Sequence, residues 1–294
     1  MRIGALEAGG TKMVCAVGDE NGNLERKVSF PTKTPEETMP VLLDFFEEQK
    51  VEAVGIGCFG PVDLNKKSPT YGCITSTPKL AWVNYNIVDA FEKRVGVPIG
   101  FDTDVNGAVL GEVCFGAAKG CESAVYITVG TGVGVGVYVN GGLLHGLLHP
   151  EAGHVLVARA SEDTYAGKCP YHPNCLEGLA AGPAIMERWG RPASELAERE
   201  EVWELESYYI AQAVTNYILT LSPQKVILGG GVMHQEQLFP LIRAKVVKML
   251  NGYVRHNAVI EEMDHYIVPP MLGGEPGIKG ALVLGRNAGQ NIVK

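Results

Sequence analysis

The sequence predicts a two-domain α/β protein, and three observations lead to this fold class. The chain has 294 residues, which is too long for one small domain and suits one large domain or two medium ones. Apolar residues make up 46% of it, so a sizeable core can be buried. A pattern of strand, glycine turn and strand occurs twice, with Thr11 and Thr131 in equivalent places. We interpret this as a duplicated architecture; the alternative is two unrelated hairpins in a glycine-rich chain.

The first half is expected to begin with a strand, a glycine turn and a second strand. Asn21-Gly22 marks a hairpin turn before a third strand. Apolar residues at helical spacing predict a helix from Pro35, with Thr34 as its N-cap. The expected strands are 3–8, 13–17, 28–30, 51–57 and 99–101, and the expected helices are 35–49, 87–95 and 105–116.

The second half repeats the opening pattern and then becomes more helical. A loop-rich insert is expected at 150–176. The expected strands are 124–129, 133–139, 143–144, 226–228 and 267–269, and the expected helices are 181–189, 201–221, 238–251 and 276–287. These elements give an N-terminal α/β domain over 1–118 and a C-terminal α/β domain over 119–294. A return of the last helix to the first domain is the alternative.

Charge and cysteine usage exclude several classes of partner. The formal net charge is −8, so the chain lacks the basic surface that nucleic acids and anionic membranes attract. Seven cysteines, mostly single within apolar runs, suit a reducing compartment. Glu7 comes too early for a signal peptide, and the uncharged stretch 123–150 contains seven glycines, which favours strands and turns over a spanning helix. We expect a cytoplasmic protein.

The two glycine turns are candidate phosphate-binding elements. Glycine allows backbone N–H groups to approach phosphate oxygens, and a threonine hydroxyl adds a donor. The first turn also offers the charge of Lys12. The alternative is that both are only hairpin turns. The candidate residues are Gly9, Gly10, Thr11 and Lys12 in the first turn, and Gly130, Thr131 and Gly132 in the second.

Asp102-Thr103-Asp104-Val105-Asn106 stands where a strand ends and a helix begins. Chemistry in α/β proteins is often placed at such strand ends. A carboxylate there could accept the proton of a substrate hydroxyl that attacks a phosphate, and we predict this role for Asp104. The alternative is that an aspartate only caps the helix.

The insert carries a candidate metal site. Cys169, His172 and Cys175 follow one another at a spacing of three, and His154 lies upstream. Two thiolates and two imidazoles suffice for a closed tetrahedral zinc site, which would stabilise a loop poor in apolar residues. A redox pair or a chance spacing are the alternatives.

Carboxylate and imidazole groups in or near the insert suit the binding of sugar hydroxyls. Glu151, His154 and Glu177 are the candidates, and solvated loop residues are the alternative. The remaining histidines show no ligand spacing and are interpreted as surface or supporting residues, with His234 near a nucleotide. They are His145, His149, His234, His256 and His265.

Taken together, these motifs resemble the ROK family of sugar kinases and repressors. The resemblance covers nearly the whole chain, and the form of the Cys/His cluster is most similar to the bacterial fructokinase branch. The motifs that carry it are Glu7-x-Gly9-Gly10-Thr11-Lys12, Gly57-x-x-Gly60-Pro61-Val62-Asp63, Asp102-Thr103-Asp104-x-Asn106, Thr128-Val129-Gly130-Thr131-Gly132-Val133-Gly134, Glu151-x-Gly153-His154, the Cys/His cluster, Cys175-Leu176-Glu177-Gly178 and Gly229-Gly230-Gly231-Val232.

The resemblance implies a two-domain actin-like ATPase (ribonuclease H-like) sugar kinase fold around an interdomain cleft. It also implies phosphorylation of a hexose by ATP with Mg²⁺, and a homodimer. Asp104 would deprotonate the 6-hydroxyl of the sugar, and Glu7 would reach Mg²⁺ through water. The implied sugar-binding residues are Thr103, Asn106, Glu151, His154 and Glu177. The implied adenosine-binding residues are Pro183, Gly230, Gly231, Val232, Met233 and His234.

Three departures from the family pattern bear on function. Glu7 stands where many members carry aspartate, and His172 stands where many use a third cysteine. Thr103 replaces the asparagine of glucose-type members, so we predict fructose as the substrate, with mannose second. Glucose, mannose or N-acetylmannosamine as the main acceptor is the alternative, and a non-catalytic sugar sensor is a more remote one. A repressor is not expected, because the first phosphate strand begins at Ile3.

Overall fold

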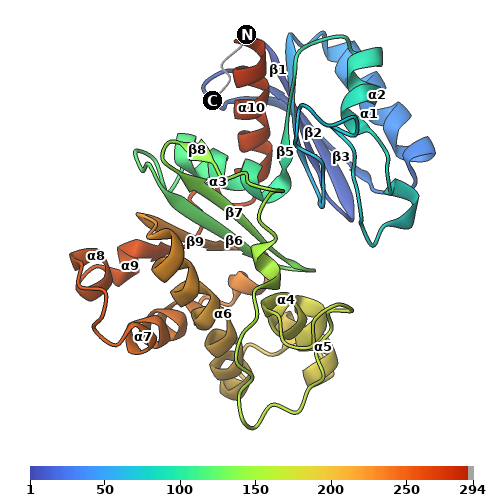
Figure 1. Ribbon diagram of the computed structural model, residues 1–294. Coiled ribbons are helices and arrows are strands. Elements are labelled where there is room, and N and C mark those ends of the chain that lie inside the picture. The colour runs from blue at the N-terminus through green and yellow to red at the C-terminus, as the bar shows by residue number, and fades with distance from the viewer. Residues whose placement is uncertain (291–294) are drawn as a thin grey trace. The chain divides into compact units, whose positions relative to one another are not determined.

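The computed structural model describes residues 1–290, and the chain divides into two compact units. Among the described residues, unit 1 contains 1–120, 142–150 and 271–290, and unit 2 contains 121–141 and 151–270. Each unit is built on one mixed sheet with helices, so the predicted α/β class is confirmed (Figure 1). Residues 142–150 and 271–290, which the sequence-based division places in the C-terminal domain, belong to unit 1.

The sheet of unit 1 brings three strand ends to one edge. Its strand order is β3-β2-β1-β4-β5, in which β1, β4 and β5 run parallel and β1, β2 and β3 pair antiparallel. The register places Ala8 beside Cys58 and Cys58 beside Thr103. The first glycine turn and the aspartate segment therefore lie at the same edge. The strands are β1 (Ile3–Ala8), β2 (Lys12–Gly18), β3 (Leu24–Pro31), β4 (Ala53–Cys58) and β5 (Ile99–Thr103).

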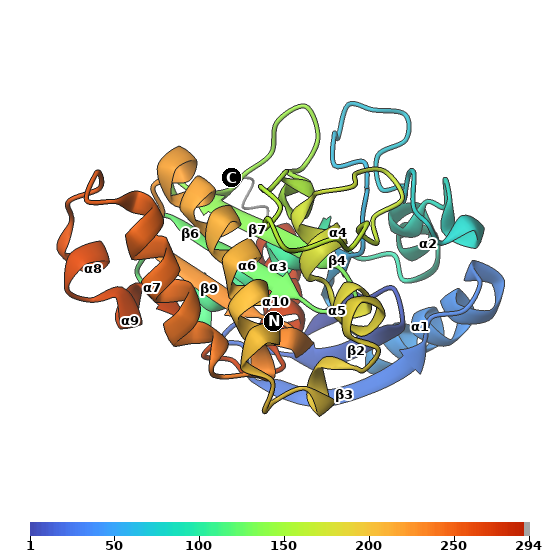
Figure 2. The ribbon, with the colours of Figure 1, turned by 90° about the horizontal axis from the view of Figure 1, so that it is seen from below.

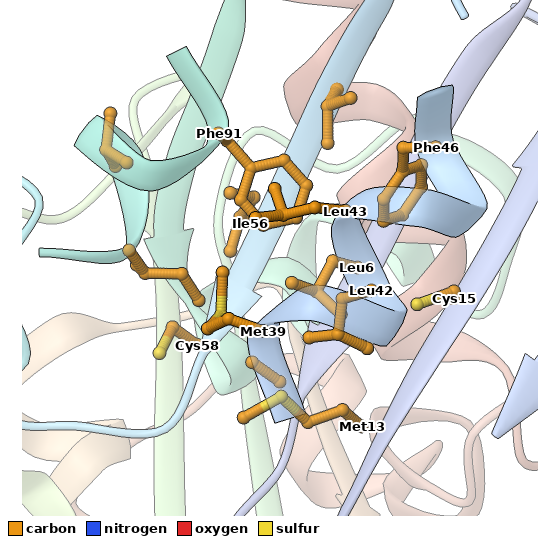
Figure 3. Close-up of a cluster of buried hydrophobic side chains, with 14 of the residues drawn as sticks. Leu6, Met13, Cys15, Met39, Leu42, Leu43, Phe46, Ile56, Cys58 and Phe91 are labelled. Atoms are coloured by element: carbon orange, nitrogen blue, oxygen red, sulfur yellow. The ribbon is translucent and has the colours of Figure 1, made fainter. Parts of the chain in front are cut away.

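Helices cover both faces of this sheet. On one face, α1 (Pro35–Gln49) and α2 (Ile87–Arg94) bury an apolar core that Figure 3 shows around Leu42, Phe46 and Phe91. On the other face, α10 (Pro276–Gly289) packs Ile278, Ala281 and Leu282 onto the apolar residues of β1 and β2. Burial of these side chains is the main stabilising term for the unit.

The helix α3 (Asp104–Phe115) packs against α10 in the same unit. A Cβ at Gly280 would overlap the backbone of Gly107, so glycine allows the two helices to approach closely. The buried Glu112 accepts hydrogen bonds from the N–H groups of Ala117 (2.6 Å), Leu272 (3.0 Å) and Met271 (3.2 Å). It thereby ties the chain that follows α3 to the chain that precedes α10.

The sheet of unit 2 has the strand order β10-β9-β6-β7, with β6 parallel to β9 and antiparallel to β7. Thr128 lies beside Gly229, so the second glycine turn and the Gly229-Gly230-Gly231 segment meet at one edge. The strands are β6 (Ala124–Val129), β7 (Val133–Val139), β9 (Lys225–Gly229) and β10 (Ile267–Val268), and a short β8 (Gly142–Leu143) follows in the chain.

Figures 1 and 2 show α6 and α7 on one face of this second sheet, where they pack against each other. The helix α4 packs against both α5 and α6. The helices of unit 2 are α4 (Leu176–Ala180), α5 (Gly182–Trp189), α6 (Glu200–Leu221), α7 (Leu238–Leu250), α8 (Asn257–Ile260) and α9 (Met263–Tyr266). Among residues 1–290, no helix combines the length and the apolar character that crossing a membrane requires.

Most expected elements are present, and the differences have physical causes. The helix 35–49 has the predicted bounds, whereas the strand predicted to end at 101 continues through Asp102 and Thr103. The helices α4, α8 and α9 were not predicted, because four or five residues are too few to show helical periodicity. The helix α4 is started by Cys175, whose Sγ accepts a hydrogen bond from the Gly178 N–H (3.3 Å).

Candidate active site

The turn between β1 and β2 is the first predicted phosphate-binding element. Ala8 pairs with Met13, so the four residues Gly9 to Lys12 form the turn. The Gly9 N–H donates to the Lys12 carbonyl oxygen (3.0 Å), and a Cβ at Gly9 would lie 2.7 Å from that oxygen. Thr11 and Lys12 are exposed. Glycine therefore closes the turn and leaves a hydroxyl and an ammonium group available to an anion.

Glu7 stands in β1, beside this turn. A Cβ at Gly277 would lie 2.8 Å from both Cδ and Oε1 of Glu7, so the carboxylate packs on the first turn of α10. Helix N-termini favour negative charge, which suits this position. Burial raises the pKa of Glu7, and the charges of Lys12 and Lys27 oppose that shift. A carboxylate oxygen near the phosphate turn is a donor of the kind that Mg²⁺ prefers.

The junction of β5 and α3 positions the predicted base. Thr103 is the N-cap of α3, since its Oγ1 accepts a hydrogen bond from the Asn106 N–H (3.1 Å). The helix cap is therefore a threonine, and the alternative of a capping aspartate is wrong. Asp104 lies in the first turn, where its Oδ1 accepts from the Val105 N–H (2.8 Å). Asp102 is buried and its Oδ1 accepts hydrogen bonds from the Thr103 N–H (2.8 Å) and Asn106 Nδ2 (2.7 Å).

Three residues of unit 1 near these elements were not predicted as site residues. His145 Nε2 lies 2.8 Å from Asp102 Oδ2, and this hydrogen bond raises the pKa of His145. His149 is buried, accepts the Val62 N–H at Nε2 (3.1 Å), and has its pKa lowered by burial. Lys79 contacts the first turn, because a Cβ at Gly10 would lie 3.0 Å from Lys79 Cε. All three are far in sequence from their partners, so residue spacing gives no signal for them.

The turn between β6 and β7 is the second predicted phosphate-binding element. Val129 pairs with Val133, so this turn has the three residues Gly130 to Gly132. The Gly130 N–H donates to the Gly132 carbonyl oxygen (2.8 Å). The Val133 N–H donates to Glu177 Oε2 (3.0 Å), and a Cβ at Gly132 would lie 2.6 Å from that oxygen. The carboxylate of Glu177 thus lies directly against the second turn.

The predicted adenosine-binding residues gather around this second turn. The Gly182 N–H donates to the Gly130 carbonyl oxygen (2.7 Å), which brings Pro183, at the start of α5, to the turn. Gly230 has a φ of +91°, a conformation that glycine adopts readily and other residues rarely. A Cβ at Gly130 would lie 3.9 Å from the Gly231 nitrogen. Of the neighbouring side chains, those of Val232 and Met233 are buried and that of His234 is exposed.

The predicted metal ligands come together in unit 2. One donor atom from each of His154, Cys169, His172 and Cys175 lies within 4.8 Å of the others. Nδ1 of His154 is 3.8 Å from Cys169 Sγ and 3.6 Å from Cys175 Sγ, and Nδ1 of His172 is 3.6 Å from Cys169 Sγ. Two sulfur and two nitrogen donors grouped in this way fit the donor set of a tetrahedral zinc site.

The same histidine also faces the predicted sugar-binding carboxylates. His154 Nε2 lies 3.8 Å from Glu177 Oε1, while its Nδ1 faces the cysteines. The His154 N–H donates to the Glu151 carbonyl oxygen (3.0 Å). Burial raises the pKa of the Glu151 carboxyl, and the Glu177 charge adds to this shift. Unit 2 therefore brings together Glu151, His154 and Glu177, and unit 1 brings together Thr103, Asp104 and Asn106.

Comparison with known proteins identifies the relatives of this chain. A model of the ROK family matches residues 3–288. A Bacillus subtilis relative is 52% identical over 97% of this chain and 96% of its own length. The fructokinase of Pediococcus pentosaceus is 44% identical over 99% of this chain and 100% of its own, and that of Zymomonas mobilis is 40% identical over 96% and 95%.

Solved structures of the same fold are also found. The ROK hexokinase of Thermus thermophilus gives a TM-score of 0.81 at 27% identity, covering 99% of this chain and 100% of that one. A ROK glucokinase of Streptomyces griseus, solved with glucose and AMPPNP, gives 0.78 at 26% identity, covering 98% and 100%. These similarities confirm the predicted sugar kinase fold.

Proposed function

This chain belongs to the ROK family, and we propose that it is a fructokinase that transfers the γ-phosphoryl group of ATP to the 6-hydroxyl of D-fructose. The observation that carries the proposal is the placement of Asp104 at the carboxyl edge of the first sheet, the edge that also holds the Gly9–Lys12 turn. Similarity to fructokinases over nearly the full chain supports fructose as the acceptor.

Asp104 acts as the general base. Its carboxylate takes the proton of the sugar 6-hydroxyl, the oxygen forms a bond to the γ-phosphorus, and the bond from that phosphorus to the β-bridging oxygen breaks to release ADP. Thr103 and Asp102 hold the start of α3 in place through hydrogen bonds to Asn106. The base therefore stands on a rigid element, which favours a fixed approach to the hydroxyl.

The two glycine turns bind the phosphates of ATP. Gly9, Gly10 and Thr11 offer one set of donors, and Gly130, Thr131 and Gly132 offer the other, while Lys12 contributes a positive charge. Glu7 would hold Mg²⁺ through water, and the ion when bound neutralises charge on the phosphates. The residues that line the adenosine pocket are Pro183, Gly230, Gly231, Val232, Met233 and His234.

Each unit contains residues that we propose to bind the sugar. Thr103 and Asn106 lie next to the base in sequence, and Glu151, His154 and Glu177 gather in unit 2. Carboxylates accept hydrogen bonds from hydroxyls in fixed directions, so several of them define one sugar orientation. Nε2 of His154 faces Glu177 and is available to this site.

Zinc has a structural role in this proposal. It would be held by His154, Cys169, His172 and Cys175, and would stabilise the insert that carries His154. Coordination through Nδ1 would also fix the tautomer of His154 and the direction of its Nε2.

The seven free cysteines suit a reducing cytoplasm. The proposed enzyme is a homodimer. Analytical ultracentrifugation at several protein concentrations tests this oligomeric state.

An assay of ADP release with a panel of hexoses tests the function. The panel contains D-fructose, D-mannose, D-glucose and N-acetyl-D-mannosamine, each with ATP and Mg²⁺. We expect the highest kcat/KM for fructose and a lower value for mannose. Equal or better turnover of glucose would make the chain a hexokinase of different preference, and no turnover with any hexose would favour a non-catalytic sugar sensor.

A further inference from the structure

The segment Gly142–Pro150 of unit 1 carries a histidine that the proposed mechanism does not use. His145 Nε2 lies 2.8 Å from Asp102 Oδ2, and the side chain of Asp102 is only 3% exposed. The side chain of His145 is 45% exposed, so one edge of the ring is held by protein and the other is open. The hydrogen bond to Asp102 therefore orients the His145 ring, and nearly half of the side chain remains accessible to solvent.

The partner of His145 is joined to the residues proposed to bind the sugar. Asp102 Oδ1 accepts hydrogen bonds from the Thr103 N–H (2.8 Å) and from Asn106 Nδ2 (2.7 Å), and its Oδ2 receives the imidazole. A single buried carboxylate therefore orients His145, Thr103 and Asn106 together. The histidine is an immediate neighbour of the unit 1 half of the sugar site.

The chemistry of the carboxylate fixes the histidine tautomer. A carboxylate oxygen accepts hydrogen bonds, so Nε2 of His145 carries a hydrogen, and Nδ1 is an acceptor in the neutral ring and a donor in the protonated ring that the Asp102 hydrogen bond favours by raising the pKa of His145. Within residues 1–290, no hydrogen bond to this Nδ1 is found. His149, in the same segment, is different: it is buried and its Nε2 is used by the Val62 N–H. Of the two histidines, only His145 has a ring nitrogen available to a ligand.

We propose that His145 binds the hexose directly, through a hydrogen bond between Nδ1 and a sugar hydroxyl other than the reacting 6-hydroxyl. This inference rests on the proposed function and names one determinant of its sugar preference. Water can hydrogen-bond to the exposed part of the imidazole in the free enzyme, and a sugar hydroxyl can replace that water without loss of a hydrogen bond.

Steady-state kinetics of His145→Ala give the first test. We expect KM for fructose to rise about tenfold, which is the loss of one hydrogen bond of about 1.4 kcal/mol, while KM for ATP stays unchanged. In His145→Gln, the amide can donate to Asp102 and offer an acceptor oxygen, so most of the affinity should return. Leu147→Ala is the matched control, because this side chain in the same segment is 100% exposed, and we expect its KM values to equal those of the parent. An unchanged KM for fructose in His145→Ala would overturn the inference.

A double-mutant cycle separates a direct contact from an effect through Asp102. The substrates are D-fructose, 1-deoxy-D-fructose, 3-deoxy-D-fructose, 4-deoxy-D-fructose and 2,5-anhydro-D-mannitol, which lacks the anomeric hydroxyl. With a direct contact, the KM ratio of variant to parent falls from about ten to about one for the one analogue that lacks the contacted hydroxyl. An equal ratio for all five substrates would mean that His145 only positions Asp102, and would overturn the inference.

Folding and the proposed function are checked separately. The melting temperature and the KM for ATP report whether each variant is folded. If His145→Ala fails to fold, His145→Asn is used in the same cycle, because its side chain is too short to reach both Asp102 and the sugar. If the parent enzyme turns over another hexose but not fructose, the proposed function fails, and the cycle is then run with deoxy analogues of that hexose.

Discussion

The two glycine hairpins have the same strand pairing but different turns and different neighbours. The β1–β2 turn has four residues, the last of which is Lys12. The β6–β7 turn has three residues, and the N–H of the following Val133 donates to Glu177 Oε2. One pair before the turn, the first hairpin carries Glu7 and the second carries Thr128. The two turns that we propose to bind phosphate therefore share one strand pairing, and the charged groups beside them differ.

The neighbours of each hairpin extend this difference to the two halves of the proposed site. In unit 1 the hairpin edge also holds Asp104, the proposed base, at the start of α3. In unit 2 the hairpin is bonded to α4 and α5, which join it to the insert with the metal cluster. A change at Asp104 is therefore expected to act on the rate, and a change at the metal cluster on sugar binding.

Replacing the base should give the largest effect on the first half. Asp104→Asn keeps the size of the side chain but removes the proton acceptor, so we expect kcat to fall by about 10²–10⁴-fold. The melting temperature and the affinity for fructose should change little, since Thr103 caps the helix. Rapid-quench or coupled assays measure kcat, and isothermal titration measures fructose binding. A loss of less than about tenfold would remove Asp104 from the mechanism.

In unit 2, the largest effect is expected from the loss of a proposed metal ligand. Cys175→Ser, or chelation, should release the ion, loosen the insert, and raise KM for fructose at least about tenfold. Elemental analysis should find one zinc ion per parent chain. Cys121→Ser is the matched control, because Cys121 is a free cysteine outside the cluster. A parent protein without zinc, but with full activity, would contradict the proposed structural metal.

The cation at the first turn gives a smaller effect. Lys12→Met removes a charge that the second turn does not have, so we expect KM for ATP to rise about tenfold, because hydrogen bonds to charged groups contribute about 1.5–3 kcal/mol. The effect should shrink at high salt, since Lys12 is exposed. Initial rates over a range of ATP concentrations measure it. An equal rise in KM for ATP in Thr131→Ala would show that the two turns do not differ in this way.

Each unit contains a buried glutamate, and the two are expected to affect the free energy of unfolding in different ways. Glu112 of unit 1 accepts three backbone N–H groups, whereas Oε1 of the buried Glu206 of unit 2 has no hydrogen-bond partner within residues 1–290. Burial raises the pKa of Glu206 well above 4.5, and the Arg188 charge opposes this shift. The folded state therefore binds this proton more tightly than the unfolded state, and stability is lost as pH rises through the folded pKa.

Glu206→Gln should accordingly raise the melting temperature at neutral pH by a few degrees, with the gain disappearing near pH 4. Glu112→Gln is the control and should lower it at both pH values, because an amide cannot accept all three N–H groups at that site. Scanning calorimetry at several pH values measures both variants. A gain for Glu206→Gln that does not depend on pH would show that its charge is not the cause.

The sequence predicts local features of this molecule better than distant contacts. Pro35 and Thr34 mark the start of α1, and the spacing of Cys169, His172 and Cys175 predicts the metal cluster, because such patterns lie within a few residues. The His145–Asp102 hydrogen bond joins residues 43 positions apart, and Glu177 reaches a backbone N–H 44 positions away. No spacing rule encodes these contacts, since they depend on how the strands and helices pack.

The position of α10 has a consequence for the order in which the molecule can be made. This helix covers Ile3, Ala5, Val14 and Ala16, yet it follows every other helix and strand in the sequence. During translation one apolar face of the first sheet therefore stays uncovered until residues 276–289 have left the ribosome. That interval is when the nascent chain is most exposed to aggregation and most dependent on chaperones.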